Sequence, residues 1–255
     1  MSWSVWGWDS GRIRELGDEF AAEGHLVLIP KLLQPALEGG TDSDGLPPDF
    51  DIGARGADFA RWVTQIPWSK LEPQVNALLD DLVARGIGKI GCMGTCWGAW
   101  ATFHASATGR IACGVNCHPS VGLEGMMGGT DMAVNLSFHH PSMRSLDTPH
   151  RRTSPSLLAT NTSHCMLQLA DTVRCPMMML PAGGDAGNTK PGGEMNQLFD
   201  TKPFGADCRY QEFPEMEHGW VSRGDTSDEK VARDVKAAME LAKGYFKKHL
   251  VGASL

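Results

Sequence analysis

A short motif in the middle of the chain constrains the fold more than any other feature. Residues 89–100 read KIGCMGTCWGAW, in which a brief apolar run is followed by GTCWG (94–98) and then by a stretch compatible with a helix. This is the pattern glycine-x-nucleophile-x-glycine, in which a strand turns sharply into a helix and glycine permits close backbone contacts. The turn exposes the apical Cys96 thiol and leaves the Trp97 N–H at a helix N-terminus, where it can stabilise negative charge. The motif predicts a nucleophilic cysteine, although a buried, inert cysteine fits the motif taken alone equally well.

Short apolar runs alternate with helix-compatible segments along most of the chain. Buried strands are predicted for residues 25–30, 89–95, 111–117, 175–181 and 208–213. Helices are predicted for residues 10–24, 58–68, 69–86 (opened by a capping box at 69–72), 96–108, 193–199 and 228–249. This alternation predicts an α/β fold with a mostly parallel sheet and helices on both of its faces.

One segment, about residues 123–164, interrupts the alternation. It is rich in Ser, Thr, Met, His and Gly and has no sustained hydrophobic period. Loops of this length are uncommon inside a compact domain. No internal repeat and no second domain are visible. We therefore predict a single domain over residues 1–255 with an irregular insertion at about 123–164.

Composition excludes several classes of protein. With 255 residues, 42% of them hydrophobic, the chain can bury the core of one α/β domain. A net charge of -7 argues against nucleic-acid or anionic-membrane surfaces. The N-terminus MSWSVWGWDS lacks the pattern of a signal peptide, and no apolar run approaches the ~18 residues that span a bilayer. Seven scattered cysteines indicate a reducing compartment, so we expect a cytoplasmic protein. We also expect a monomer or a weak dimer.

Two further residues complete a possible catalytic triad. Asp185 follows the apolar run CPMMMLPAGG, and His218 follows CRYQEFPEME. Open α/β sheets place their sites beyond the C-terminal ends of strands, and the chain order nucleophile, acid, base is that of α/β-hydrolases. Taken singly, Asp185 also fits a turn and His218 a surface loop. His139, His140 and His164 lack the spacing of a zinc site, and no metal is predicted.

Several segments together resemble a known family. GWDSGRIRELGDEFAAEGHLVLIP, GCMGTCWGAW, NCHPS, CPMMMLPAGGD and EFPEMEHGWVSRGD are similar to the dienelactone hydrolase family, a cysteine-nucleophile branch of the α/β-hydrolase fold. The resemblance covers nearly the whole chain except about residues 123–164. It implies action on lactones and activated esters such as carboxymethylenebutenolides, without a metal or an organic cofactor.

The resemblance also implies roles for individual residues. Cys96 would be the nucleophile, His218 the base and Asp185 the acid that orients it. The backbone N–H groups of Trp97 and Val5 would form the oxyanion hole.

Three residues are candidates for substrate binding. Arg223, just after HGW, falls near the family's arginine that meets the substrate carboxylate, and an ordinary exposed arginine is an equally good interpretation. Trp6 and Trp220 are candidates for an apolar pocket, although most tryptophans belong to protein cores.

The chain departs from the family pattern at three places. Ser4 stands where the family usually has an acidic residue that tunes the thiol, and Lys31 follows Pro30 where the family has aspartate. The strand that should lead into Val5, and those before it, lie outside the sequence, so the N-terminal strands of the sheet are expected to be missing.

The sequence therefore favours a hydrolase of activated esters or lactones that uses a Cys-His-Asp triad and a thioester intermediate. The alternative is a catalytically inactive α/β-hydrolase scaffold that binds a ligand or a protein, which Ser4 and the missing strands favour. A glutaminase-type thiol enzyme is a third interpretation, but it would need an acid where Trp220 stands.

Overall fold

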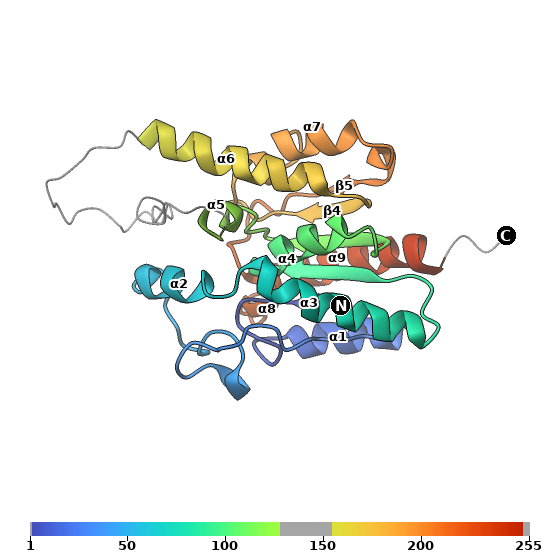
Figure 1. Ribbon diagram of the computed structural model, residues 1–255, viewed down its shortest axis with the longest axis horizontal. Helices are drawn as coiled ribbons and strands as arrows, with labels where there is room; N and C mark the ends of the chain where they lie inside the picture. The colour runs from blue at the N-terminus through green and yellow to red at the C-terminus, as the bar shows by residue number, and fades with distance from the viewer. Residues whose placement is uncertain (1, 128–154, 252–255) are drawn as a thin grey trace, which may run out of the picture.

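A parallel five-stranded sheet forms the centre of the computed structural model, which describes residues 2–127 and 155–251 (Figure 1). The strands follow one another across the sheet in sequence order, and every neighbouring pair is parallel. They are β1 (Ser2–Trp3), β2 (Gly91–Thr95), β3 (Cys113–Cys117), β4 (Met177–Leu180) and β5 (Arg209–Tyr210). Met93 is aligned with Val115, and Val115 with Met178, across the three central strands.

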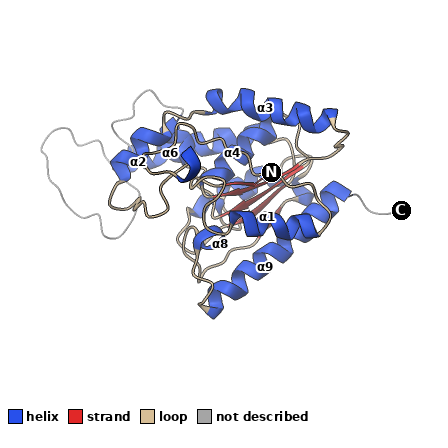
Figure 2. Cartoon of the chain, turned by 90° about the horizontal axis from the view of Figure 1, so that it is seen from below, coloured by secondary structure: helices blue, strands red, loops and turns tan. Residues whose placement is uncertain are grey.

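Helices cover both faces of this sheet. In Figure 2 the strands lie between a layer that contains α3, α4 and α6 and a layer that contains α1, α8 and α9. The helices are α1 (Ile13–Ala22), α2 (Gly56–Val63), α3 (Trp68–Ala84), α4 (Trp97–Ala107), α5 (Leu123–Met127), α6 (Pro155–Thr172), α7 (Glu194–Asp200), α8 (Trp220–Arg223) and α9 (Glu229–Phe246). Short 3-10 turns lie at Thr41–Ser43, Gly187–Thr189 and Gly205–Asp207, and a π-helical turn, Lys247–Val251, follows α9. The predicted α/β fold, with a parallel sheet and helices on both faces, is confirmed.

The core is divided by the sheet into two hydrophobic clusters. All five residues of β2 and of β3 are buried, which fits strands covered on both faces. Because successive side chains of a strand point to opposite faces, Cys92 packs with the cluster that contains Trp97 and Leu79. Met93 packs with the cluster that contains Ile13 and Met239.

The apolar run at residues 25–30 is not a strand, contrary to the prediction. No strand of the described residues pairs with it, although Val27 and Ile29 pack against Gly17 of α1. A cavity of about 320 Å³ is lined both by residues 25–28 and by residues 86–91. A strand needs backbone hydrogen bonds to a neighbour, and an apolar run shows only that side chains will be buried.

The first strand is present as a short element. β1 pairs in parallel with Met93 and Gly94 of β2 and leads directly into Val5. Ser2 and Trp3 therefore occupy the place next to the elbow strand where the sequence was expected to provide none.

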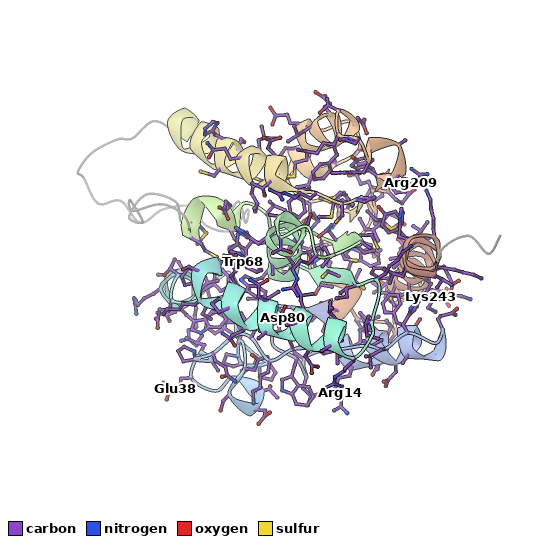
Figure 3. The ribbon with its side chains drawn as sticks, turned by 45° about the vertical axis from the view of Figure 1, so that its right-hand side comes forward. Arg14, Glu38, Trp68, Asp80, Arg209 and Lys243 are labelled. Carbon is purple, nitrogen blue, oxygen red and sulfur yellow. The ribbon has the colours of Figure 1, made fainter. Side chains whose placement is uncertain are left out.

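Two predicted helix features are wrong. The capping box at residues 69–72 is absent, because α3 begins at Trp68 after Pro67 and has no side-chain cap. Trp68 (Figure 3) stacks on the His104 ring with centroids 4.9 Å apart, and this contact lies in the first turn of α3. Residues 155–164, predicted as irregular, belong to α6, while the part of that segment at 128–154 lies outside the described residues.

The Glu124 side chain connects α5 to α4 through contacts with two side chains of α4. The Glu124 carboxylate accepts a hydrogen bond from the Trp100 indole over 2.7 Å and contacts His104 Nε2 over 2.8 Å. This connection fixes the chain that follows the end of β3.

Candidate active site

The sharp turn predicted around Cys96 is present between β2 and α4. Cys96 has φ 57° and ψ −118°, a conformation that non-glycine residues rarely adopt. A Cβ atom at Gly94 would overlap the carbonyl group of Gly98, which explains why glycine is required there. The Cys96 N–H donates to the Cys117 carbonyl of β3 over 3.1 Å. The thiol thus stands, half-buried, at the C-terminal edge of the sheet.

The predicted acid and base are in direct contact. Asp185 follows β4 and His218 follows β5, and the Asp185 Oδ1 to His218 Nδ1 distance is 2.7 Å. The second carboxylate oxygen accepts the Ala182 N–H over 2.7 Å. The Asp185 side chain is 4% exposed and that of His218 is 41% exposed, so a buried carboxylate orients an imidazole that solvent can reach.

A serine that the sequence analysis did not assign lies beside both reactive groups. Ser120 Oγ is 3.4 Å from Cys96 Sγ and 3.2 Å from His218 Nε2. It belongs to NCHPS (116–120), which contains the last two residues of β3, the strand next to the elbow strand. The tendency of parallel sheets to gather their sites at strand C-termini was the available signal.

The electrostatic environment favours a thiolate at Cys96. Burial alone would raise the pKa of this thiol, but the His218 charge and hydrogen bonds from His218, Ser120 and the Trp97 N–H lower the pKa below its ordinary value. Burial alone would lower the pKa of His218, but the Cys96 charge and the hydrogen bond to Asp185 raise it to about 10. Each group stabilises the charged form of the other, as in other thiolate–imidazolium pairs.

Other cysteines have the opposite environment. Burial raises the pKa of Cys92 to about 11 and the pKa values of Cys117 and Cys175 to about 12. These thiols stay protonated at neutral pH and behave as small apolar side chains.

A second histidine packs against the base. His118 is fully buried, and its ring lies edge-on to the His218 ring with centroids 4.9 Å apart. Burial, together with the His218 charge, lowers the pKa of His118 well below its usual value, so this ring stays neutral. Its contact restricts the orientation of His218 without adding a charge.

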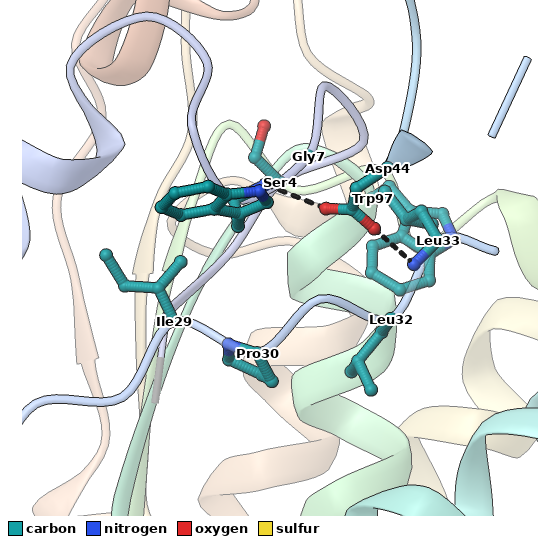
Figure 4. Close-up of a pocket in the computed structure, with 9 residues that line it drawn as sticks. Ser4, Gly7, Ile29, Pro30, Leu32, Leu33, Asp44 and Trp97 are labelled. Atoms are coloured by element: carbon teal, nitrogen blue, oxygen red, sulfur yellow. Dashed lines mark hydrogen bonds between the residues drawn. The ribbon is translucent and has the colours of Figure 1, made fainter. Parts of the chain in front are cut away.

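The loop before α1, residues 4–8, is held in place by the chain at residues 44–46. The Trp8 N–H and the Leu33 N–H both donate to the Asp44 carboxylate over 2.8 Å. Figure 4 shows this carboxylate beside Leu33. The Val5 carbonyl accepts the Leu46 N–H over 3.2 Å. Ser4, Asp44 and Trp97 line the same small pocket, so this loop lies next to the start of α4. The sequence patterns indicated no role for residues 44–46.

Ser4 takes no part in activating the thiol in the described structure. It is 5% exposed, and its hydroxyl accepts the Trp6 N–H over 3.5 Å.

The three predicted substrate-binding residues fall in different places. The Arg223 guanidinium carbon lies 3.8 Å from the centre of the Trp6 ring, and its nitrogens donate to Ser10 Oγ and to the Pro48 carbonyl. Among the ion pairs of the described residues, none involves Arg223. Trp220 is 2% exposed and packs on Phe213 with ring centroids 4.6 Å apart, which makes it a core residue.

Two other classes of site are absent from residues 2–127 and 155–251. No three His, Cys, Asp or Glu side chains there gather as metal ligands, and His139 and His140 lie outside these ranges. No helix there has the length and apolar character needed to cross a bilayer.

The fold and the turn at Cys96 define the class of the protein. A parallel sheet with a sharp, glycine-flanked turn after one strand, and a carboxylate and an imidazole in contact after later strands, is the arrangement of an α/β-hydrolase. The model of the dienelactone hydrolase family matches residues 2–250, and the chain belongs to this family.

Among solved structures, the chain is similar to the monoacylglycerol lipase of Paleococcus ferrophilus, with 18% identity, a TM-score of 0.39, and coverage of 68% of this chain and 75% of the lipase. A search of curated proteins finds no significant match.

Proposed function

We propose that this chain hydrolyses activated esters or lactones, such as carboxymethylenebutenolides, through a Cys96–His218–Asp185 triad and a thioester intermediate. The observation that carries the proposal is the series of contacts that runs from Asp185 through His218 to a thiol whose pKa is lowered. Membership of the dienelactone hydrolase family supports hydrolysis as the type of reaction.

In the acylation step the Cys96 thiolate attacks the carbonyl carbon of the substrate. A sulfur–carbon bond forms, and the carbonyl electron pair moves to oxygen. The N–H groups of Trp97 and Val5 would stabilise this oxyanion, because backbone donors at a helix N-terminus oppose developing negative charge. Collapse of the intermediate breaks the carbon–oxygen bond, and the imidazolium of His218 gives its proton to the leaving oxygen.

In the deacylation step water attacks the thioester. Neutral His218 takes a proton from this water while a carbon–oxygen bond forms. Collapse of the second intermediate expels the Cys96 sulfur as a thiolate and releases the carboxylic acid product. This restores the thiolate–imidazolium pair. Asp185 keeps His218 Nδ1 protonated throughout and so presents Nε2 to the reacting atoms.

The lowered pKa of Cys96 also limits the substrates. A weakly basic thiolate is itself a good leaving group, so the tetrahedral intermediate goes forward only when the substrate's leaving group is comparably stable. Enol esters and enol lactones release a stabilised enolate, whereas amides do not. This argument favours activated acyl compounds as substrates.

A negative group on the substrate has a plausible partner in Arg223. Its guanidinium uses two nitrogens for Ser10 and Pro48 and has further N–H donors. It rests on Trp6, the neighbour of Val5, and so lies against the loop that would hold the oxyanion. We therefore include binding of a substrate carboxylate by Arg223 in the proposal.

Covalent labelling with an electrophilic enol lactone, read by mass spectrometry of the Cys96 peptide, tests this function. We expect stoichiometric labelling of Cys96, no labelling after Cys96→Ala, and at least about tenfold slower labelling after His218→Ala, because the imidazolium charge lowers the thiol pKa. Hydrolysis of the lactone should fall by about 10²-fold or more in both variants.

Cys165→Ala is the matched control, because it also removes a half-buried thiol but one on α6. Labelling and hydrolysis should survive this change. Labelling that ignores both Cys96→Ala and His218→Ala, in a chain whose circular dichroism melt shows a folded protein, would instead support the inactive scaffold.

A further inference from the structure

Ser120 contacts both of the groups that exchange a proton in the proposed reaction. Its Oγ is 3.4 Å from Cys96 Sγ and 3.2 Å from His218 Nε2. Because His218 Nδ1 is occupied by Asp185, Nε2 is the nitrogen available on the side of the thiol. The hydroxyl therefore contacts both atoms between which the proton moves.

The backbone fixes Ser120 relative to Cys96. The Cys96 N–H donates to the Cys117 carbonyl over 3.1 Å, and the Ser120 N–H donates to the Cys96 carbonyl over 3.2 Å. His118, which lies between Cys117 and Ser120 in the chain, has φ 37° and a fully buried ring that packs on His218. A left-handed residue other than glycine persists only where its surroundings fix it, so this turn holds the Ser120 hydroxyl in one place.

The hydroxyl matches the needs of both protonation states. Serine has one O–H donor and two acceptor lone pairs. In the neutral state the thiol S–H donates to Ser120 Oγ, and the Ser120 O–H donates to His218 Nε2. In the charged state the Nε2–H donates to Ser120 Oγ, and the Ser120 O–H donates to the thiolate.

Passage between these states is balanced. The S–H bond and the original serine O–H bond break, while a new serine O–H bond and an Nε2–H bond form. One proton moves from sulfur to imidazole, no electrons are exchanged, and the serine is regenerated.

We propose that Ser120 is a fourth functional residue of this site, which donates to the Cys96 thiolate, accepts from the His218 imidazolium and relays the proton between them. The inference rests on the proposed function, in which Cys96 is the nucleophile.

The pH dependence of Cys96 alkylation by iodoacetamide tests the inference without any substrate. The rate reports the thiolate fraction, and mass spectrometry of the Cys96 peptide separates it from the other six cysteines. Ser120→Ala should raise the apparent pKa of Cys96 by about one unit or more, which is a tenfold or greater loss of thiolate at pH values below that pKa. Ser120→Thr keeps the hydroxyl and should stay within about half a unit of the unmodified protein.

Ser106→Ala is the matched control. Ser106 is a buried serine whose hydroxyl accepts the Arg174 N–H over 3.0 Å and lies 3.5 Å from the Cys175 sulfur. Its removal should leave the Cys96 profile unchanged. Circular dichroism melts verify that each variant is folded, and Ser120→Gly, which also lacks the hydroxyl, serves if the alanine variant does not fold.

The outcomes separate this inference from the proposed function. An unchanged Cys96 pKa after Ser120→Ala or Ser120→Gly, or an equal shift after Ser120→Thr, overturns the role of Ser120. If His218→Ala raises the Cys96 pKa while loss of the Ser120 hydroxyl does not, the triad stands and only this inference fails. If neither change moves the pKa, the proposed function fails as well.

Discussion

At the scale of single residues, the reactivity of this site depends on which neighbours Cys96 has. Cys92 is only four residues away, yet burial is the largest effect on its thiol and raises its pKa to about 11. Cys96 is close to a histidine, a serine hydroxyl and the Trp97 N–H, and these contacts reverse the effect of burial on its pKa. One residue type thus has two chemistries, and the contacts of Cys96 with His218, Ser120 and the Trp97 N–H make the difference.

Asp185→Asn tests how far the triad depends on a charge behind the base. The carboxylate accepts from two N–H groups, those of His218 Nδ1 and Ala182, each over 2.7 Å. An asparagine side chain has one acceptor oxygen, so its NH₂ group would face one of these two donors. We expect lactone hydrolysis to fall by about 10²–10⁴-fold.

The pH profile of the same variant should shift in a defined direction. The Asp185 hydrogen bond and charge raise the pKa of His218, so their loss lowers that pKa below about 10. The alkaline limb of acylation, which needs the imidazolium as acid, should then move to lower pH. Glu124→Gln is the control, since Glu124 is also paired with a histidine but lies outside the triad. A profile of Asp185→Asn identical to that of Glu124→Gln would contradict the prediction.

At the scale of elements, the loop that carries Val5 is positioned by a segment about forty residues away in sequence. Gly45, between Asp44 and Leu46, has φ +71°, and a Cβ atom there would lie 2.6 Å from the Trp6 carbonyl carbon and 2.8 Å from the Val5 oxygen. Glycine is therefore needed both for its conformation and for the close approach of two backbones. The loop before α1 and the segment 44–46 act as one unit.

Gly45→Ala should move the loop at residues 4–8 without changing the pKa of the Cys96 thiol. We expect kcat to fall by about 10²-fold, as for loss of an oxyanion donor, while the alkylation pKa of Cys96 stays the same. Gly192→Ala is the matched control, because Gly192 has a similar φ of +77° but no atom within 4 Å of the added Cβ. Its melting temperature should fall from backbone strain with kcat preserved. Equal kcat values for the two variants would show that the close contact at Gly45 is unimportant.

The sequence predicted those parts of the site that local patterns encode. The turn at Cys96 has a signature of a few neighbouring residues, and Asp185 and His218 follow recognisable apolar runs. Asp44 and Ser120 were not assigned, because each acts through contacts with distant backbone or side-chain atoms that leave no periodic signal. The Asp44 carboxylate, for example, accepts a hydrogen bond from the N–H of Trp8, which is 36 residues away in the sequence.

At the scale of the whole molecule, alternation of apolar runs and helices was enough to predict the architecture but not every strand. Residues 111–117 and 175–181 were predicted as strands, and β3 and β4 lie within them. Each of these two strands forms because it is hydrogen-bonded to a neighbouring strand on either side. Residues 25–30 have the same apolar character and no paired neighbour among the described strands. Pairing is a property of the assembled sheet, which a single run of residues does not contain.

Buried cysteines lie on both faces of this sheet, so their reactivity can test whether the sheet unfolds as one cooperative unit. Five are buried at or just before strands β2 to β5: Cys92, Cys113, Cys117, Cys175 and Cys208. Three of these pack in the cluster with Trp97 and two in the cluster with Ile13. Exposing any of them requires separating helices from a sheet whose strands share hydrogen bonds.

We expect all five thiols to become reactive at one urea concentration. Pulses of iodoacetamide across a urea series, read peptide by peptide, should give a single midpoint for the five, whereas the half-buried Cys165 on α6 should react before unfolding. Cys208 is the decisive residue, because it precedes β5, a two-residue strand that pairs only with β4 among the described strands. If Cys208 reacts at a lower urea concentration than Cys92, the β5 edge opens by itself and the sheet is not one cooperative unit. A shared midpoint would mean that the strands positioning Cys96, Asp185 and His218 are lost together, so that activity and burial of these thiols disappear at the same urea concentration.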